Sequence, residues 1–417
     1  MSAHKIRLEP NNVQRTYLAK AAGTARFAYN WGLHRWQEEY ELHKLDPSHP
    51  KPSQFSLRRE LNTKKREEYP WMTEVTKCAP QEALIDLGTA FARFFKGQSK
   101  YPNFKKKYKN DSFTLSSGTF AVDGNRVRIP KLGYVNMSES LRFQGKINSA
   151  KINSATISRK ADQWFVSFAV EVDDPGPTVK PKLSVGVDLG ITTLATLSDG
   201  SKVNGPKAHT RLLKKQKRLN RQLSREQKGS KNRYKTRMEL ARLHSRIANV
   251  RSDSLHKLTT ELASNYEIIC IEDLNVSGMV KNHNLARAVS DMGFYEFRRQ
   301  LQYKCDRSGS ELVVVDRWYP SSKTCSTCGE VVDSLPLSIR RWRCQGCGYE
   351  QDRDINAAKN IERVGLASIS CPTASSAGSN DCGEESSGQP LNFGSTTGET
   401  IVCETVSERQ MSNGKFV

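Results

Sequence analysis

Four cysteines and two aspartates in the last quarter of the sequence have the types and spacing of metal ligands. The cysteines form two C-x2-C pairs separated by fifteen residues, namely Cys325, Cys328, Cys344 and Cys347. This spacing is typical of four thiolates that hold one structural zinc ion. Asp352 and Asp354 follow the second pair, and carboxylates without thiolate partners are typical ligands of hard cations such as Mg²⁺. The segment therefore predicts a structural zinc ribbon followed by part of a second metal site.

Two further acids stand where apolar strands are expected to end. Asp188 follows Ser-Val-Gly-Val, and Glu272 follows Ile-Ile-Cys-Ile. A carboxylate at the end of a buried strand is costly unless a cation compensates its charge. Because side chains alternate along a strand, Glu272 and Asp273 point to opposite faces, and only one of them can enter a given site. Strands that each deliver one carboxylate to one edge predict a divalent-metal site, where two ions about 4 Å apart can hydrolyse a phosphodiester.

The third carboxylate of this site is expected from Asp354 and not from Asp352. A helix is expected to begin at Asp354, and its positive N-terminal end favours the ionised carboxylate that metal binding needs. For any one acid alone, a helix N-cap or a surface charge is the better explanation. The three acids together, in a basic protein, favour the metal site.

The elements that must position these acids alternate along the second half of the sequence. Periodicity and turn residues predict two strands around Gly190 within 183–198, strands at 267–271 and 311–315, a helix at about 291–306 and a last helix from about 354. After Val364 few large apolar residues remain, so residues 366–417 are expected to form a disordered tail.

The first half is expected to contain a helical part and a strand-rich part. A short strand at 4–8 ends at Pro10-Asn-Asn, which offers a helix N-cap. Helical periodicity follows over 13–43 with a break at Gly23, then a proline-containing loop at 44–56 and a further helix over 80–95. Alternating segments from 112 to 172, with a hairpin turn at Asp123-Gly-Asn, predict an antiparallel sheet or a small barrel.

The charge balance indicates a polyanionic partner. The 417 residues include 65 Lys and Arg against 44 Asp and Glu, a formal net charge of +21. Such an excess favours nucleic acid or an anionic membrane. No apolar run approaches the length of a membrane span, and the N-terminus lacks a hydrophobic signal region. Nucleic acid is therefore the expected partner, with no membrane association and a cytoplasmic, nucleoid-associated location.

The positive charge is concentrated in two segments. Between Lys207 and Arg251 there are sixteen Lys or Arg and two Glu, while apolar residues keep helical spacing, so an amphipathic helix with one cationic face is expected. A solvated face is the ordinary explanation of a charge run, but this density of one sign favours phosphate contacts. Its candidates are Lys214, Lys215, Lys217, Arg218, Arg221 and Arg225. A basic loop adds Tyr101, Lys105, Lys106 and Lys107, which can stack bases and contact phosphates or form only a solvated turn.

Taken together, these motifs resemble those of one family. The segments SVGVDLGITTLATLSDG, RIANVRSDSLHKLTTELASNYEIICIEDLNVSGM and CQGCGYEQDRDINAAKNI resemble the split RuvC-type nuclease domain and zinc ribbon of TnpB. TnpB is the transposon-encoded RNA-guided nuclease related to type V CRISPR effectors. The N-terminal KIRLEPNNVQRTYLAKAAGTARFAYNWGL and the KYPNFKKK segment resemble its helical domain. The resemblance covers roughly residues 4–365.

The resemblance implies a multidomain fold of α/β and β-barrel parts. It implies an RNase H-like (RuvC) nuclease core at 180–320 plus 349–365, interrupted by the zinc ribbon at 321–348. A helical recognition domain is implied at 11–111, and a wedge-like β-barrel at 1–10 plus 112–178. The family's catalytic and Mg²⁺ (or Mn²⁺) binding roles carry over to Asp188, Glu272 and Asp354, and its structural Zn²⁺ ligands carry over to the four cysteines.

The resemblance also implies partners and an activity. A guide RNA from the right end of the transposable element reads the target double-stranded DNA by base pairing, and the protein grips the heteroduplex by its backbone, as a monomer on one RNA. A short flanking DNA motif needs direct base contacts, for which Lys77 and Gln81 are candidates by their position in the family. The implied activity is Mg-dependent cleavage of guide-matched DNA by two-metal hydrolysis.

Three other functions fit parts of the sequence. A nuclease-silent RNA-guided DNA-binding regulator is expected to lack acids of the triad, and none is missing here. A transposase that catalyses strand transfer would need an end-specific DNA-binding module, which is not obvious in the sequence. A zinc-ribbon RNA-binding protein without catalysis leaves the acids at the strand ends unexplained.

Overall fold

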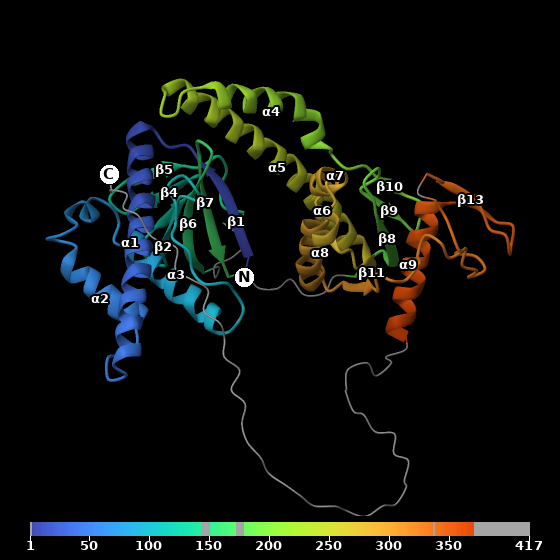
Figure 1. Ribbon diagram of the computed structural model, residues 1–417, viewed down its shortest axis with the longest axis horizontal. Helices are drawn as coiled ribbons and strands as arrows, with labels where there is room; N and C mark the ends of the chain where they lie inside the picture. The colour runs from blue at the N-terminus through green and yellow to red at the C-terminus, as the bar shows by residue number, and fades with distance from the viewer. Residues whose placement is uncertain (1, 143–150, 172–178, 337, 371–417) are drawn as a thin grey trace, which may run out of the picture. The chain divides into compact units, whose positions relative to one another are not determined.

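The computed structural model describes residues 2–142, 151–171, 179–336 and 338–370 (Figure 1). The predicted disordered tail therefore lies almost entirely outside the described residues. Its first residues, 366–370, do not belong to a tail, because the last helix, α9, runs from Arg353 to Ser370. Within the part of the chain that the structure describes, no helix is long and apolar enough to cross a membrane.

The N-terminal strand and helix follow the sequence closely, with one correction. Strand β1 (Ser2–Leu8) is followed by Asn11, whose side chain accepts a hydrogen bond from the Gln14 amide at 2.9 Å and caps helix α1 (Asn12–Leu45). The predicted break at Gly23 is wrong, because α1 is continuous over 34 residues. A Cβ at Gly23 would meet only the end of Arg26, at 3.9 Å, so this glycine lies in open space and imposes no bend.

The predicted loop at 44–56 is too long at its C-terminal end. Helix α2 (Gln54–Lys64) begins two residues after the last proline of that segment, where Ser53 caps it by accepting from the Ser56 amide. A short 3-10 helix, η1 (Pro70–Glu74), and helix α3 (Cys78–Phe95) follow. Helix α3 matches the predicted helix, and its apolar face packs against α1.

Two antiparallel sheets complete the N-terminal part. The first has the order β1-β7-β6-β2, with β2 (Ser112–Ser116), β6 (Ile152–Lys160) and β7 (Gln163–Val170). The second has the order β3-β4-β5, with β3 (Ala121–Asp123), β4 (Arg126–Ile129) and β5 (Gly133–Asn136), and contains the predicted hairpin at Gly124. A bridge from Leu8 to Met137 joins them. The antiparallel sheet is confirmed, whereas closure into a barrel stays a prediction.

A five-stranded mixed sheet forms the centre of the C-terminal part. Its order is β10-β9-β8-β11-β12, made of β8 (Lys182–Leu189), β9 (Ala195–Leu197), β10 (Lys202–Val203), β11 (Tyr266–Glu272) and β12 (Glu311–Val315). Strands β8, β11 and β12 are parallel, and β9 and β10 form an antiparallel edge. This arrangement agrees with the predicted RNase H-like core.

The two faces of this sheet are covered by different helices. Val185, Val187, Ile269 and Ile271 face one side, where they share an apolar core with α5 (Lys231–Asn265) and α8 (Phe294–Ser308). The intervening residues face α9 on the other side, where Cys270 and Ile361 are fully buried together. At Gly186 a Cβ would lie 2.0 Å from the Ala358 carbonyl oxygen of α9, so only glycine permits this approach. Figure 1 shows α9 beside β8.

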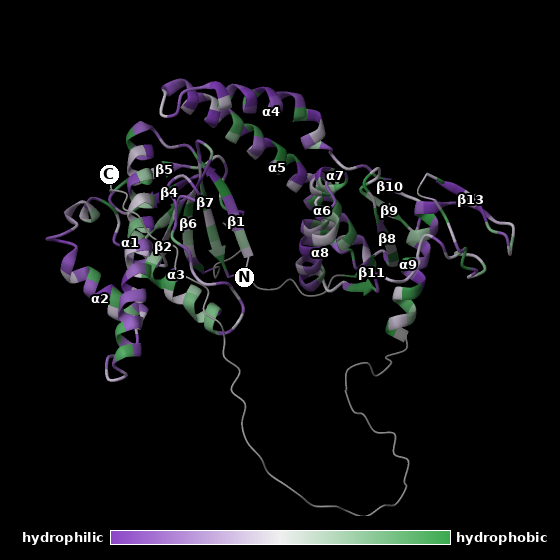
Figure 2. Ribbon diagram, viewed as in Figure 1, coloured by the Kyte–Doolittle hydropathy of each residue, from purple (hydrophilic) through white to green (hydrophobic). Residues whose placement is uncertain are grey.

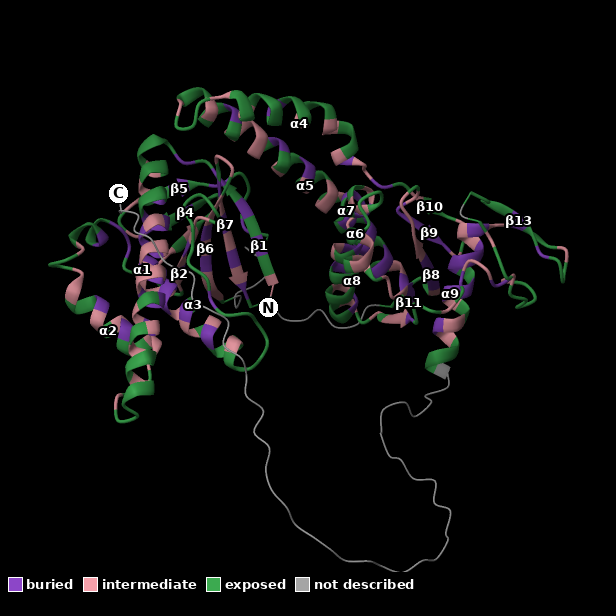
Figure 3. Cartoon of the chain, in the orientation of Figure 1, coloured by how far each residue is buried: buried purple, intermediate pink, exposed green. Residues whose placement is uncertain are grey.

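The predicted cationic helix over 207–251 is two helices. Helix α4 (Ala208–Arg225) and the long α5 pack against each other and are joined by a turn in which Gly229 has a φ of 88°. Ser230 caps α5 by accepting from the Arg233 amide at 3.1 Å. Helix α4 is largely hydrophilic and exposed (Figures 2 and 3). The short helices α6 (Val276–Lys281) and α7 (Ala286–Met292) complete this part.

Candidate metal centres

Asp188 and Glu272 stand at matching positions on neighbouring parallel strands. The last registered pair of β8 and β11 is Val187 with Ile271, and each acid is the next residue of its strand. By strand alternation both share the face of Gly186 and Cys270, which is the face that α9 covers. The structure therefore brings the two predicted acids to one edge of the sheet and one side of it.

Asp273 is the acid that the alternation turns away. Its carboxylate accepts a hydrogen bond from Arg298 of α8 at 2.5 Å and another from Arg317 after β12. These two guanidinium groups lower the pKa of Asp273. Asp273 thus has a structural role as a doubly paired anion, which leaves Glu272 as the acid on the α9 side.

Asp352 and Asp354 also have different surroundings. One carboxylate oxygen of Asp352 accepts the amide hydrogens of Asp354 at 3.0 Å and Ile355 at 3.1 Å, and the other accepts from Lys202 at 2.8 Å. Asp352 therefore caps the start of α9, which is the ordinary role of an acid at this position. Asp354 lies in the first turn of α9 and pairs with the more exposed Arg340, at 3.4 Å.

The pKa of Asp188 responds to burial and to the two other acids. Burial, followed by the negative charges of Asp354 and Glu272, raises the pKa of Asp188 to about 7, although Arg353 and Arg340 oppose the shift. Burial also raises the pKa of Glu272. Burial and the neighbouring negative charges thus disfavour the ionised form of Asp188, and a bound divalent cation would relieve this cost.

This group of acids is not drawn tightly together. In the described ranges, the four cysteines are the only set of three or more His, Cys, Asp or Glu whose ligand atoms all lie within 4.8 Å of one another. Three carboxylates without a cation repel, so their wider spacing is physically reasonable. The residue types, all hard oxygen donors, fit Mg²⁺ or Mn²⁺.

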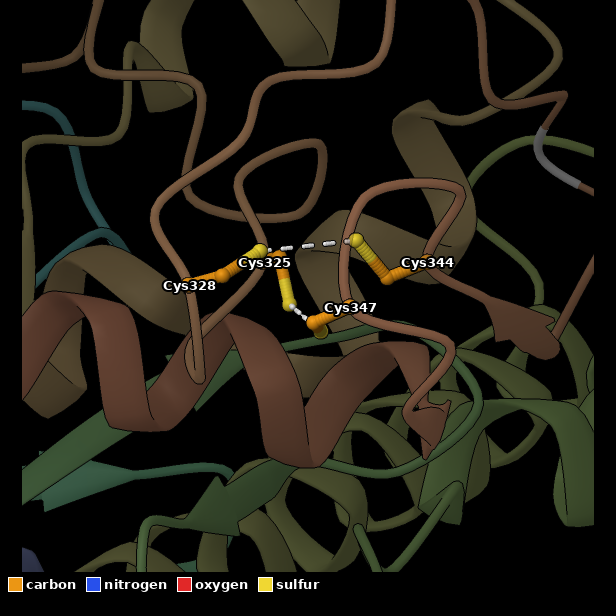
Figure 4. Close-up of side chains that lie close together, drawn as sticks. All are labelled: Cys325, Cys328, Cys344 and Cys347. Atoms are coloured by element: carbon orange, nitrogen blue, oxygen red, sulfur yellow. Dashed lines mark hydrogen bonds between the residues drawn. The ribbon is translucent and has the colours of Figure 1, made fainter.

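The four cysteine sulfurs form a compact cluster (Figure 4). The sulfurs of Cys325 and Cys347 are 3.7 Å apart, and those of Cys328 and Cys344 are 3.6 Å apart. Four thiolates in a tetrahedron with zinc–sulfur bonds of about 2.3 Å have sulfurs about 3.8 Å apart. The cluster therefore has the size and donor set of a closed structural zinc site.

The two cysteine pairs adopt the same local turn. Gly329 and Gly348, which directly follow the second cysteine of each pair, have φ angles of 83° and 73°. The Gly329 amide donates to the Cys325 carbonyl and the Gly348 amide to that of Cys344. Although burial acts to raise it, the pKa of Cys325 falls to about 6, because the backbone amides of Cys328 and Thr327 donate to its sulfur. The first turn thus favours the thiolate form of Cys325, the form that binds zinc.

The predicted phosphate contacts on α4 lie on the surface. All six predicted cations are exposed, namely Lys214, Lys215, Lys217, Arg218, Arg221 and Arg225. The last three of these border an open pocket of about 360 Å³. The buried face of α4 is short and centres on Leu219, which packs against Leu243 and Ile247 of α5. The exposed side of α4 is thus free to meet a polyanion, and its role stays a prediction.

The other predicted nucleic-acid residues are only partly available. Lys106 and Lys107 are exposed, whereas the Lys105 ammonium lies 3.9 Å from the centre of the Tyr29 ring. Tyr101 contacts Phe91 and Phe94 edge to face, so part of its ring is already used in packing. Lys77 is exposed just before α3, and Gln81 is half-buried one turn later.

Three buried polar residues near Asp354 were not predicted as part of the site. Asn356 and Asn360 are almost fully buried on α9, and their side chains bind backbone groups of the zinc ribbon. Arg353, also buried, donates to the Pro336 carbonyl at 2.9 Å. Their signal in the sequence is the spacing Asp354-Ile-Asn-Ala-Ala-Lys-Asn, which places two amides four residues apart on one helix face.

Three family profiles match consecutive parts of the chain. Residues 1–44 match a family described as "Helix-turn-helix domain", 167–283 one described as "Probable transposase", and 294–361 one described as "Cas12f1-like, TNB domain". The last match spans α8, β12, the cysteine cluster and the first half of α9. Among solved structures, the chain is similar to that described as "Cryo-EM structure of the Cas12f1-sgRNA-target DNA complex", with a TM-score of 0.52 and 14% identity over 84% of this chain and 83% of that chain.

Sequence relatives match over nearly their full lengths. A Streptomyces pristinaespiralis protein named "Putative RNA-guided DNA endonuclease" is 40% identical over 88% of this chain and 90% of its own. The Escherichia coli K12 protein "Putative RNA-guided DNA endonuclease InsQ" is 33% identical over 89% and 94%. The solved structure supports the fold, and the relatives carry the assignment. The chain belongs to the TnpB family.

Proposed function

We propose that the protein is an RNA-guided DNA endonuclease of a transposable element, which cuts guide-matched DNA beside a short flanking motif. Membership of the TnpB family supports this activity. The structural observation that supports it is the parallel register that sets Asp188 beside Glu272 on the face covered by α9, with burial and the charges of Asp354 and Glu272 raising the pKa of Asp188 to about 7. A half-buried group of acids of this kind is poorly explained by a binding protein without catalysis.

In this proposal Asp188, Glu272 and Asp354 hold Mg²⁺ or Mn²⁺. Divalent ions bound there supply an activated water and stabilise the leaving oxygen of a phosphodiester. The chain positions the acids: parallel register aligns Asp188 with Glu272, and the first turn of α9 carries Asp354. The four cysteines hold Zn²⁺ with no open ligand position, so zinc has a structural role.

The partners follow from the charge of the surface. The exposed cations of α4 contact the sugar-phosphate backbone of the guide RNA or of its duplex with the target strand. Base pairing then reads the target sequence, and the protein needs base contacts only at the flanking motif. The guide is expected to come from the right end of the element, with one protein molecule bound to one RNA.

The test begins with RNA that copurifies with the protein. Sequencing that RNA identifies the guide, and a library of matched DNA duplexes with randomised flanks is then offered to the purified complex. We expect cleavage in Mg²⁺ of matched duplexes carrying one short flanking motif, and none in EDTA. Equal cleavage of matched and scrambled duplexes would contradict the proposal. Guide-directed binding without cleavage in Mg²⁺ or Mn²⁺ would indicate a silent regulator, and strand transfer without RNA would indicate a transposase.

A further inference from the structure

Two asparagines lie buried between Asp354 and the cysteine cluster. Asn356 is 1% exposed and Asn360 is 0% exposed, and both come from the face of α9 that meets the zinc ribbon. Buried side-chain amides are costly unless their donors and acceptors are satisfied. Their hydrogen-bond partners therefore show which neighbouring segment must be ordered for α9 to bury these amides.

Apart from Arg363 of α9, which donates to the Asn360 side-chain oxygen at 3.1 Å, the partners belong to the segment around the first cysteine pair. The Asn356 amide donates to the Thr324 carbonyl at 2.8 Å, and its oxygen accepts from the Ser326 amide at 2.8 Å. The Asn360 amide donates to the Thr324 carbonyl at 2.6 Å and to the Ser321 carbonyl at 2.9 Å. Ser326 lies between the two cysteines of this pair. The hydrogen bonds of the two asparagine amides therefore depend on the ordered turn at Cys325 and Cys328.

The opposite side of α9 contacts the sheet at Ala358, Glu362 and Gly365, and Asp352 just before the helix accepts from Lys202 of β10 at 2.8 Å. Ser184 of β8 donates to Glu362 at 2.6 Å, and a Cβ on Gly365 would lie 2.3 Å from the Cys270 sulfur of β11. A Cβ on Gly186 of β8 would lie 2.0 Å from the Ala358 carbonyl oxygen. The first turn of α9, which contains Asp354, precedes the contacts that the helix itself makes with the sheet. Ribbon contacts at Arg353 and Asn356 stand on either side of Asp354 in sequence.

We propose that Asn356 and Asn360 are positioning residues that make the placement of Asp354 depend on the zinc-bound fold of the ribbon. Zinc therefore sets the affinity of the carboxylate site for its divalent cation without touching that cation. The inference rests on the proposed function only in taking Asp188, Glu272 and Asp354 as cation ligands. Groups that orient metal ligands commonly change metal affinity about 10- to 100-fold when removed.

The experiment compares divalent-cation affinity in three variants of the full-length protein–RNA complex. Asn360→Leu keeps the side-chain volume and removes the amide, and Asn356→Ala removes the second amide. Lys359→Ala is the matched control, because Lys359 lies between them on α9 and is exposed. Mn²⁺ binding is measured by electron paramagnetic resonance, with Asp188→Asn defining the signal that belongs to the carboxylate site. Zinc per chain and melting temperature are measured on the same samples.

We expect both asparagine variants to keep wild-type zinc and to bind Mn²⁺ about 10-fold more weakly. Cleavage should need about 10-fold more Mg²⁺ for its half-maximal rate and recover toward the wild-type rate at saturation. Lys359→Ala should match wild type in every measurement. Unchanged Mn²⁺ affinity in a zinc-loaded Asn360→Leu complex overturns the inference. So does loss of zinc from that variant, because the amides would then hold the ribbon and not position Asp354.

The outcome separates this inference from the proposed function. If the wild-type complex binds Mn²⁺ at the carboxylates and cuts no guide-matched DNA, the proposed endonuclease activity fails while the affinity comparison still decides the role of the asparagines. Absence of any Asp188-dependent Mn²⁺ signal in wild type overturns the inference itself.

Discussion

At the scale of single residues, acids that are close in sequence differ in role because their hydrogen-bond partners differ. Strand alternation predicted that only one of Glu272 and Asp273 could enter the site, and the two arginines bound to Asp273 show which one is turned away. The choice between Asp352 and Asp354 rested on where the last helix begins, and the hydrogen bonds of Asp352 to the helix amides support that choice. The arginine partners of Asp273 come from distant segments, so strand alternation alone could not show which acid is turned away, and the resemblance supplied the choice of Glu272.

The raised pKa of Asp188 predicts a pH-dependent effect on stability in the metal-free protein. The folded pKa of about 7 lies above the ordinary value of 3.8, so the ionised form is disfavoured by folding. The cost of ionising Asp188, which lowers the free energy of unfolding, is small near pH 4, grows as pH rises and is complete above pH 7. With EDTA present, Asp188→Asn should therefore melt about 3 °C or more above wild type at pH 8, and at the same temperature near pH 4. Equal melting temperatures at pH 8, measured by scanning calorimetry, would count against the buried anionic site.

At the scale of elements, correct and incorrect predictions have identifiable physical causes. The buried strands were predictable because apolar runs of strand length end in acids or turns. Gly23 suggests a helix break, yet it lies within a continuous helix of 34 residues where a Cβ would meet only the end of Arg26. The start of α2 was missed because three nearby prolines suggested a loop, although Ser53 provides a cap. The turn between α4 and α5 was hidden by charged residues on both sides of Gly229.

Two glycine substitutions test this account of the helices. Gly186→Ala places a Cβ 2.0 Å from a backbone oxygen of α9, which cannot move without shifting the helix, so we expect a loss of roughly 1–3 kcal/mol or more of stability. Gly23→Ala, in open space within α1, should instead stabilise the protein by about 0.5–1 kcal/mol. Urea unfolding measures both. A stabilising Gly186→Ala would show that α9 does not lie against β8.

Removal of one cysteine tests the ribbon as a separate structural element. Cys344→Ser should release most of the zinc and expose residues 321–348 to limited proteolysis, because zinc ribbons derive much of their folding free energy from the metal. Cys305→Ser, at a buried cysteine of α8 outside the cluster, is the matched control and should keep its zinc. Mass spectrometry measures the zinc content of both variants. Zinc retained by Cys344→Ser would contradict the four-cysteine site.

At the scale of the whole molecule, the sequence predicted the family and the order of the helices and strands better than the contacts between segments far apart in the chain. Motifs and charge lie in short segments and can be read directly. The contacts of Asn356 and Asn360 with Thr324 join segments about thirty residues apart, and the sequence shows only that two amides share a helix face. The barrel stays a prediction because it depends on closure between the two antiparallel sheets. The nucleic-acid contacts stay predictions because they depend on bound RNA and DNA.

The net charge of +21 predicts RNA binding that weakens steeply with salt. If α4 contacts phosphates, replacing both Lys217 and Arg221 by alanine should lower affinity and reduce the slope of log K against log salt by about 1 to 2. The double variant Lys257→Ala with Lys359→Ala removes the same charge from other exposed positions and should leave the slope near wild type. Filter binding across a salt series gives both values. Equal slopes for the two double variants would remove α4 from the interface.

The central claim is that the carboxylates of β8, β11 and α9 form the site at which guide-matched DNA is cut. The most direct measurement is cleavage of a matched duplex in Mg²⁺ by complexes carrying Asp188→Ala, Glu272→Gln or Glu267→Gln, each with its RNA content verified. Glu267 lies at the other end of β11 and is exposed, so it is the matched control. We predict that Asp188→Ala and Glu272→Gln abolish cleavage while binding RNA normally, and that Glu267→Gln cuts like wild type. Wild-type cleavage by Asp188→Ala would contradict the account.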